Sequence, residues 1–132
     1  MSWDEKLLFG LHLGYSFVPL GFLLVAIAQW GGFEPVAALH VWSVGGIGMM
    51  TLVVMARSTR GHTGMPLLAS RVTVASHFTL LAAALLRPMT SVWPEMTTAL
   101  LAATGLCWIL AFALYLLEYG SVLLQRRRLR GD

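Results

Sequence analysis

The chain has 132 residues, of which 58% are hydrophobic and only 11% are charged, and its formal net charge is +3. Soluble domains carry roughly a quarter charged residues, so this composition excludes an ordinary soluble enzyme and indicates a single membrane domain over residues 1–132. Most of the positive charge lies at the C-terminus. It therefore indicates membrane topology rather than nucleic-acid binding, and no nucleic-acid partner is expected.

Four apolar segments follow one another along the chain, and we expect helices at about 6–29, 36–57, 67–87 and 94–124. Each segment has roughly 20 residues or more, enough to cross a hydrocarbon core about 30 Å thick. Strands are not expected, because apolar and polar residues do not alternate. The sequence thus predicts an all-α fold, a four-helix transmembrane bundle in a lipid bilayer.

The basic residues predict how this bundle is oriented. With four spans, the N-terminus, the loop after the second helix and the C-terminal tail share one side of the membrane. The opposite side carries Arg87 alone, whereas the shared side carries Lys6, Arg57, Arg60, Arg71, Arg126, Arg127, Arg128 and Arg130. By the positive-inside rule, both termini are expected to be cytoplasmic.

The first two segments combine histidines with glycines. In the first, Tyr15 and Ser16 follow His12 at i+3 and i+4, where they could orient its imidazole on the same helix face. In the second, His40 precedes a glycine-rich run at positions 45, 46 and 48. The glycines fit either close helix packing or a planar cofactor pressed against the backbone, and both interpretations stay open.

The end of the second segment is expected to open into a loop that carries Arg57, Arg60 and His62, the last within Gly61-His62-Thr63-Gly64. His77 is expected near the middle of the third helix. Ionisable residues inside a membrane span mark functional sites, and histidines around a glycine-rich helix suggest metal or haem ligation. The depth of each histidine in the membrane can be estimated from the rise of about 1.5 Å per helical residue. These depths pair His12 with His62 on the inner side, and His40 with His77 on the outer side.

The remaining polar residues have alternative interpretations. Arg57, Arg60 and Arg87 are expected at membrane boundaries, where topology explains them and where they could pair with haem propionates. Glu118 is expected at the bilayer edge, paired with an arginine of the tail. Cys107 and the methionines of the second helix are interpreted as core residues rather than as metal ligands. No catalytic triad, phosphate loop, C-x-x-C or H-E-x-x-H motif occurs, which excludes hydrolytic and nucleotide chemistry.

Several short stretches resemble one known family. They are Leu11-His12-Leu13-Gly14-Tyr15, Leu39-His40 followed by Val44-Gly45-Gly46-Ile47-Gly48, Met55-Ala56-Arg57 leading to Gly61-His62-Thr63-Gly64, and Ala83-Ala84-Leu85-Leu86-Arg87. Together they resemble the NnrS family of bacterial inner-membrane proteins, which contain haem and copper and are tied to nitric oxide metabolism. The chain is similar to the C-terminal part of longer members.

The resemblance implies the ligands and partners of this chain. It implies that His12, His40 and His62 are ligand candidates, while His77 is a further metal-ligand candidate taken from the residues alone. The leading hypothesis is a haem b protein, with copper as a second metal, that binds nitric oxide and reduces it with electrons from a separate donor. Self-association into a homo-oligomer is expected to compensate for the missing helices.

Two other classes of function remain as alternatives. The first is a non-catalytic module that senses nitric oxide or haem, or delivers metal to another complex. The second is a small proton-coupled exporter, a class that requires a carboxylate deep in a span, and the first three predicted helices contain none.

Overall fold

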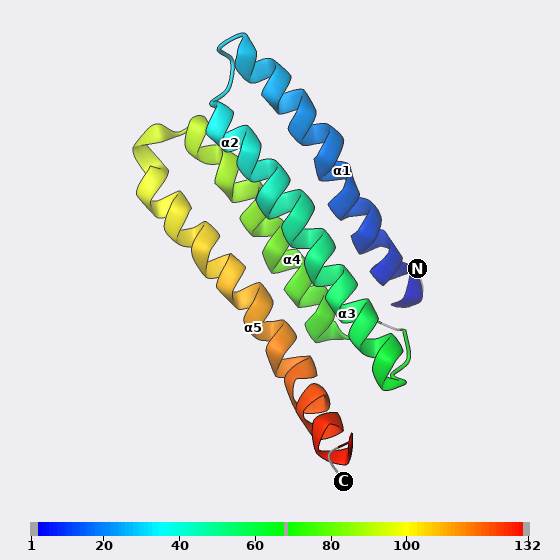
Figure 1. Ribbon diagram of the computed structural model, residues 1–132. Coiled ribbons are helices and arrows are strands. Elements are labelled where there is room, and N and C mark those ends of the chain that lie inside the picture. The colour runs from blue at the N-terminus through cyan, green and yellow to red at the C-terminus, as the bar shows by residue number, and fades with distance from the viewer. Residues whose placement is uncertain (1–2, 68, 131–132) are drawn as a thin grey trace.

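Each of the four apolar segments forms a helical unit, since backbone groups inside a bilayer must satisfy one another (Figure 1). The computed structural model describes residues 3–67 and 69–130, and the side chains of residues 6–125 within that range. The described residues contain no strand. Four segments are long and apolar enough to cross a membrane, namely Lys6–Gln29, Pro35–Thr63, Arg71–Ser91 and Pro94–Gln125. The predicted all-α membrane bundle is confirmed, and the chain is a multi-pass membrane protein.

The first two units differ in regularity. Helix α1 (Trp3–Gln29) is continuous and ends in a turn where Gly31 has a φ of +77°. The second unit consists of α2 (Pro35–His40), the π-helical segment η1 (Val41–Gly48) and α3 (Met49–Thr63). The sequence did not predict the π-helical segment, a wider coil that often occurs at functional sites.

The last two units are joined by short 3₁₀ turns. Helix α4 (Arg71–Leu86) begins at Ser70, whose hydroxyl accepts a hydrogen bond of 3.0 Å from the amide of Thr73. The turns η2 (Arg87–Ser91) and η3 (Pro94–Met96) then lead into α5 (Thr97–Arg130). Both turns contain a proline in their first positions, which suits the start of a helix but not its interior.

The loop predicted after residue 57 begins later than expected. Helix α3 continues to Thr63, so Arg60 and His62 are helical residues. The helix ends because Gly64 adopts a left-handed conformation with a φ of +73°, and the amide of Met65 donates to the carbonyl of Arg60 at 3.0 Å. The prediction that Arg60 and His62 lie in a loop is therefore wrong.

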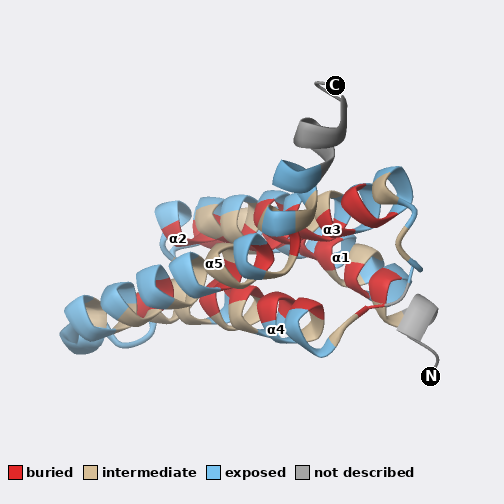
Figure 2. Ribbon diagram, turned by 90° about the horizontal axis from the view of Figure 1, so that it is seen from below, coloured by how far each residue is buried: buried red, intermediate tan, exposed pale blue. Residues whose placement is uncertain are grey.

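The helices form an open arrangement in which α1 packs on the second unit and α5 packs along α4 (Figure 1). Buried residues line the faces where neighbouring helices meet, and exposed residues cover the outside (Figure 2). The buried core draws on all four units and includes Phe17, Val41, Met49, Leu52, Leu80, Ala111, Tyr115 and Tyr119. Large exposed apolar side chains on the outside suit a surrounding bilayer.

Helix α1 begins, and α5 ends, at the same end of the bundle as the turn between α3 and α4 (Figure 1). We refer to it as the terminal end. The tail arginines 126, 127, 128 and 130, which contribute most to the predicted orientation, lie outside the residues whose side chains are described. That the terminal end is cytoplasmic remains a prediction.

Candidate functional site

The last turns of α3 carry polar side chains on its outer surface. Arg57, Ser58 and His62 line one open groove of about 400 Å³, together with Gly61 and the apolar side chains of Val54 and Leu67. Positions 57, 58, 61 and 62 fall on one side of a helix because residues three and four apart are neighbours. We call it the α3-end groove. It combines an imidazole and a guanidinium at the terminal end of the second span.

Arg60 points in the other direction, into the bundle. Its side chain is 6% exposed and forms an ion pair of 2.9 Å with Glu118, which is 12% exposed. Its Nε donates to the hydroxyl of Tyr119 at 2.7 Å, and its Nη1 donates to the carbonyl of Pro66 at 3.0 Å. Within the described residues Glu118 therefore pairs with Arg60. The tail arginines predicted as its partners lie outside the residues whose side chains are described, and the boundary position of Arg60 stays a prediction.

The carboxylate of Glu118 is also held from α4. It accepts hydrogen bonds from the hydroxyls of Ser70 and Thr73, the latter at 2.6 Å. Thr73 is in turn 2.8 Å from the hydroxyl of Tyr119. One turn earlier on α5, the hydroxyl of Tyr115 is 2.8 Å from Thr59 on α3. This polar cluster connects α3, α4 and α5, whereas α1 contributes nothing to it among the contacts described here.

His77 lies in the interior beside α1. Its side chain is only 9% exposed, and a Cβ placed on Gly10 would lie 3.6 Å from its Nδ1. Among the described residues, Nε2 of His77 is the buried side-chain nitrogen or oxygen without a hydrogen-bond partner. Buried polar atoms are almost always paired, so this nitrogen is available to a small ligand or a water molecule.

His40 and Arg87 lie at the end of the bundle opposite to the terminal end. His40 is half-buried, and the charges of Arg87 and Glu34 both act on it. Arg87 donates to the hydroxyl of Thr90 at 3.0 Å, and Ser91 donates to Glu34 at 3.4 Å. This polar group joins the start of the second unit to the turn after α4.

Several glycines lie where neighbouring helices pack closely. A Cβ on Gly45 would lie 2.4 Å from the ring of Phe17, and a Cβ on Gly48 would lie 2.8 Å from the ring of Trp108. The ring of Trp42 fills the space beside Gly21, and its Nε1 donates to the carbonyl of Val18 at 2.9 Å. Close packing is therefore the explanation at Gly21, Gly45 and Gly48.

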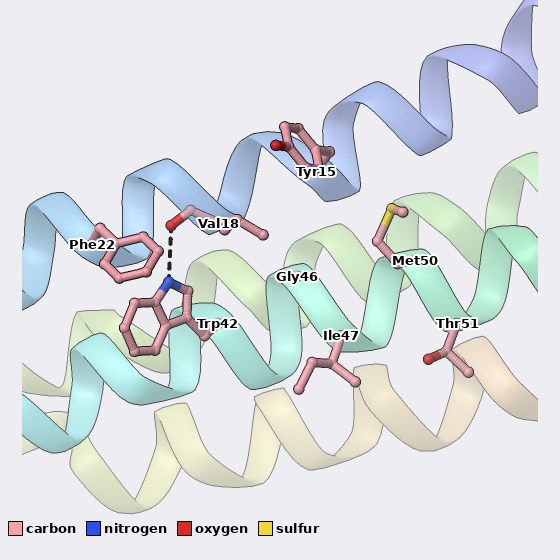
Figure 3. A pocket seen from close by; sticks show the side chains of 8 residues that line it. All are labelled: Tyr15, Val18, Phe22, Trp42, Gly46, Ile47, Met50 and Thr51. Carbon is pink, nitrogen blue, oxygen red and sulfur yellow. Dashed lines mark hydrogen bonds between the residues drawn. The ribbon is translucent and has the colours of Figure 1, made fainter.

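Gly46 is different because it borders an open groove. The groove has a volume of about 610 Å³ and lies between α1 and η1, with Tyr15, Phe22, Trp42 and Met50 among its walls (Figure 3). A Cβ on Gly46 would meet Val18 only at 3.8 Å. We call this the α1–η1 groove. It is an apolar, aromatic-walled surface that no histidine lines.

In a comparison with family models, the NnrS protein model matches residues 1–127. The chain belongs to the NnrS family. No curated protein and no solved structure matched the chain in the corresponding comparisons. The predicted resemblance to NnrS is confirmed, and family membership supports a role in nitric oxide-related metabolism.

The NnrS fold seen here separates the predicted histidines. His62 lines the α3-end groove, His77 is in the interior, His40 lies near the opposite end, and His12 is on the exposed side of α1. Within the described part of the chain, no group of three or more His, Cys, Asp or Glu side chains could hold a metal ion. Because His77 packs against Gly10, near the start of α1, the predicted outer pair of His40 with His77 is wrong.

Two polar features of this NnrS chain escaped the sequence analysis. The buried cluster was missed because Thr59, Ser70 and Thr73 are ordinary residues near helix ends. Tyr115, Glu118 and Tyr119 nevertheless gave a signal, since three polar groups lie within two turns of an otherwise apolar segment. The second feature, the groove shared by Arg57 and His62, became visible only when α3 proved to continue past residue 57.

Proposed function

We propose that this protein binds haem b in a bacterial inner membrane and uses it to bind and reduce nitric oxide. The observation that carries the proposal is the α3-end groove, where one helix end presents both His62 and Arg57. Imidazole is a haem-iron ligand, and guanidinium pairs well with carboxylates such as the haem propionates. The volume of about 400 Å³ is within the range of cofactor sites.

In this proposal His62 holds the iron and Arg57 pairs with a propionate. Val54 and Leu67 supply apolar walls of the same groove. Bound haem would supply an iron coordination position for nitric oxide and a one-electron redox couple. The protein contributes ligand orientation and water exclusion, while a separate donor provides electrons and a second nitric oxide molecule completes the reduction to nitrous oxide and water with two protons.

The buried polar cluster around Arg60 and Glu118 stabilises the end of α3 that carries His62. The ion pair of Arg60 with Glu118 fixes the last turns of α3 against α5, and His62 extends from the opposite side of those same turns. A ligand on a helix held in this way keeps its orientation more precisely than a ligand on a free loop. The proposal therefore assigns Arg60 a positioning role rather than contact with the haem.

The test uses purified protein from cells supplied with haem precursor. Under anaerobic conditions, we expect nitric oxide to shift the Soret band of the ferrous protein, and we expect consumption of nitric oxide when a reductant is present. A shifted band without consumption would contradict reduction and favour a sensor or metal-delivery module. Metal analysis of the same sample decides whether copper accompanies iron.

A further inference from the structure

The exposed side of α1 carries polar groups where a lone helix would face lipid. Its buried side is formed by Gly10, Gly14, Phe17 and Gly21, and the opposite side carries His12, Tyr15 and Ser16. All three positions lie inside the membrane-spanning segment Lys6–Gln29, and α1 is at the edge of the bundle (Figure 1). Ionisable residues in membrane spans, such as His12, almost always face the bundle interior or a water-filled cavity rather than lipid. One copy of the chain therefore leaves this side of α1 incomplete.

The hydrogen bonds of these side chains show which donors and acceptors on this side of α1 lack a partner. Nδ1 of His12 is 2.8 Å from the carbonyl of Leu8. A carbonyl only accepts, so Nδ1 carries the proton, and Nε2 of the neutral ring is an acceptor. Ser16 is already satisfied, because it donates to the carbonyl of Leu13 at 2.6 Å. Nε2 of His12 has no hydrogen-bond partner in the described part of the chain.

Tyr15 provides the matching donor. Its side chain is 66% exposed, and its hydroxyl has no hydrogen-bond partner among the described residues. Tyr15 follows His12 by three residues, which places the two side chains on neighbouring parts of the surface and about 4.5 Å apart along the helix. One helix thus presents an unused acceptor and an unused donor next to each other. They do not satisfy each other within the chain.

We propose that α1 pairs with α1 of a second copy of this chain, and that Tyr15 of each chain donates to Nε2 of the partner's His12. In a twofold-symmetric dimer, a contact from one residue to another is repeated in reverse, so a helix with one donor and one acceptor is self-complementary. The contact continues into the α1–η1 groove, which Tyr15 also lines. A different protein or a lipid would instead need an acceptor for the hydroxyl of Tyr15 and a donor for Nε2 of His12, at the same spacing.

The first test is disulfide cross-linking in native membranes. The background variant is Cys107→Ser, which removes the natural thiol, and Ser16→Cys then places a thiol on the proposed contact. Copper–phenanthroline oxidation should produce a covalent dimer of this variant. The matched control is Leu117→Cys on α5, which is 77% exposed on another surface and should stay monomeric. No dimer from Ser16→Cys, or equal dimer from both variants, would overturn the proposal.

The second test measures self-association of the full chain in lipid vesicles by energy transfer between labelled copies. Tyr15→Phe keeps the ring and removes the donor, so the dissociation constant should rise on the order of tenfold through the loss of two symmetric hydrogen bonds. An unchanged constant would overturn the proposed contact. The proposed dimer contact involves protein groups alone and does not require haem. Absorbance spectra of the same samples measure haem binding, so a failure of the dimer proposal can be distinguished from a failure of the proposed function.

Discussion

At the scale of single residues, the buried pair of Arg60 and Glu118 explains why two charges occur inside an apolar bundle. The pair is supported by further hydrogen bonds, among them those with the hydroxyls of Thr73 and Tyr119. Such a pair contributes little compared with apolar packing, but the removal of one member leaves the other charge buried and unpaired. The cluster is therefore sensitive to substitution of either partner.

We expect Glu118→Ala to destabilise the protein by about 3–5 kcal/mol, because Arg60 would keep its buried charge without a partner. The matched control is Glu95→Ala, which removes an exposed carboxylate in η3 and should change stability by no more than about 0.5 kcal/mol. The measurement is unfolding by SDS in mixed micelles, followed by circular dichroism. Equal stability of the two variants would show that the ion pair does not hold the helices together.

His77 provides a second prediction at this scale. Its Nε2 lacks a partner among the described residues, so His77→Leu should keep stability within about 1 kcal/mol of the wild type or raise it, because an unpaired polar atom is removed. We also expect unchanged haem content, in contrast to His62→Leu. If His77→Leu lost the Soret band while keeping its helical content, His77 would be the ligand and our assignment would fail.

At the scale of elements, hydropathy was sufficient to predict the four helical units, and α1 ends at Gln29 as expected. It could not predict the π-helical segment, because Gly45 and Gly48 adapt to the rings of Phe17 and Trp108, which come from other helices. Nor could it predict the end of α3. Residues 57–63 are mostly polar, and the helix continues through them to the left-handed cap at Gly64, which hydropathy does not register.

The glycines of η1 allow a matched pair of substitutions. Gly45→Ala should destabilise the protein by about 1–3 kcal/mol through overpacking, because the new Cβ would lie 2.4 Å from the ring of Phe17. Gly46→Ala should be neutral or mildly stabilising, because its Cβ would meet Val18 at an ordinary 3.8 Å. Unfolding in mixed micelles compares the two variants. The reverse order of stability would contradict the packing described for η1.

At the scale of the whole molecule, the chain is a thin bundle in which α1 touches mainly the second unit and α5 touches mainly α4. The sequence indicated the right residue types for a site, but it could not indicate which of them meet. His12, His40, His62 and Arg57 are the same kinds of residue wherever they point, and only the packing of α3 places Arg57 beside His62. The outward direction of His12 likewise required the structure.

The orientation of the molecule is testable by fusion proteins. Because the terminal end carries most of the arginines of the sequence, a C-terminal green fluorescent protein should fluoresce, and a C-terminal alkaline phosphatase should be inactive. A phosphatase fused after Val92, at the opposite end, should be active. The reverse pattern of activities would place the α3-end groove on the outer side of the membrane and contradict the predicted cytoplasmic termini.

The central claim is that this chain holds haem through His62. The most direct measurement is the haem content of the purified protein by the pyridine haemochrome method, after expression with haem precursor, for the wild type, His62→Ala and the matched His40→Ala variant. We predict that the wild type and His40→Ala contain haem b, and that His62→Ala loses most of its haem. A wild-type protein that folds as a helical membrane protein and contains no haem would contradict the account.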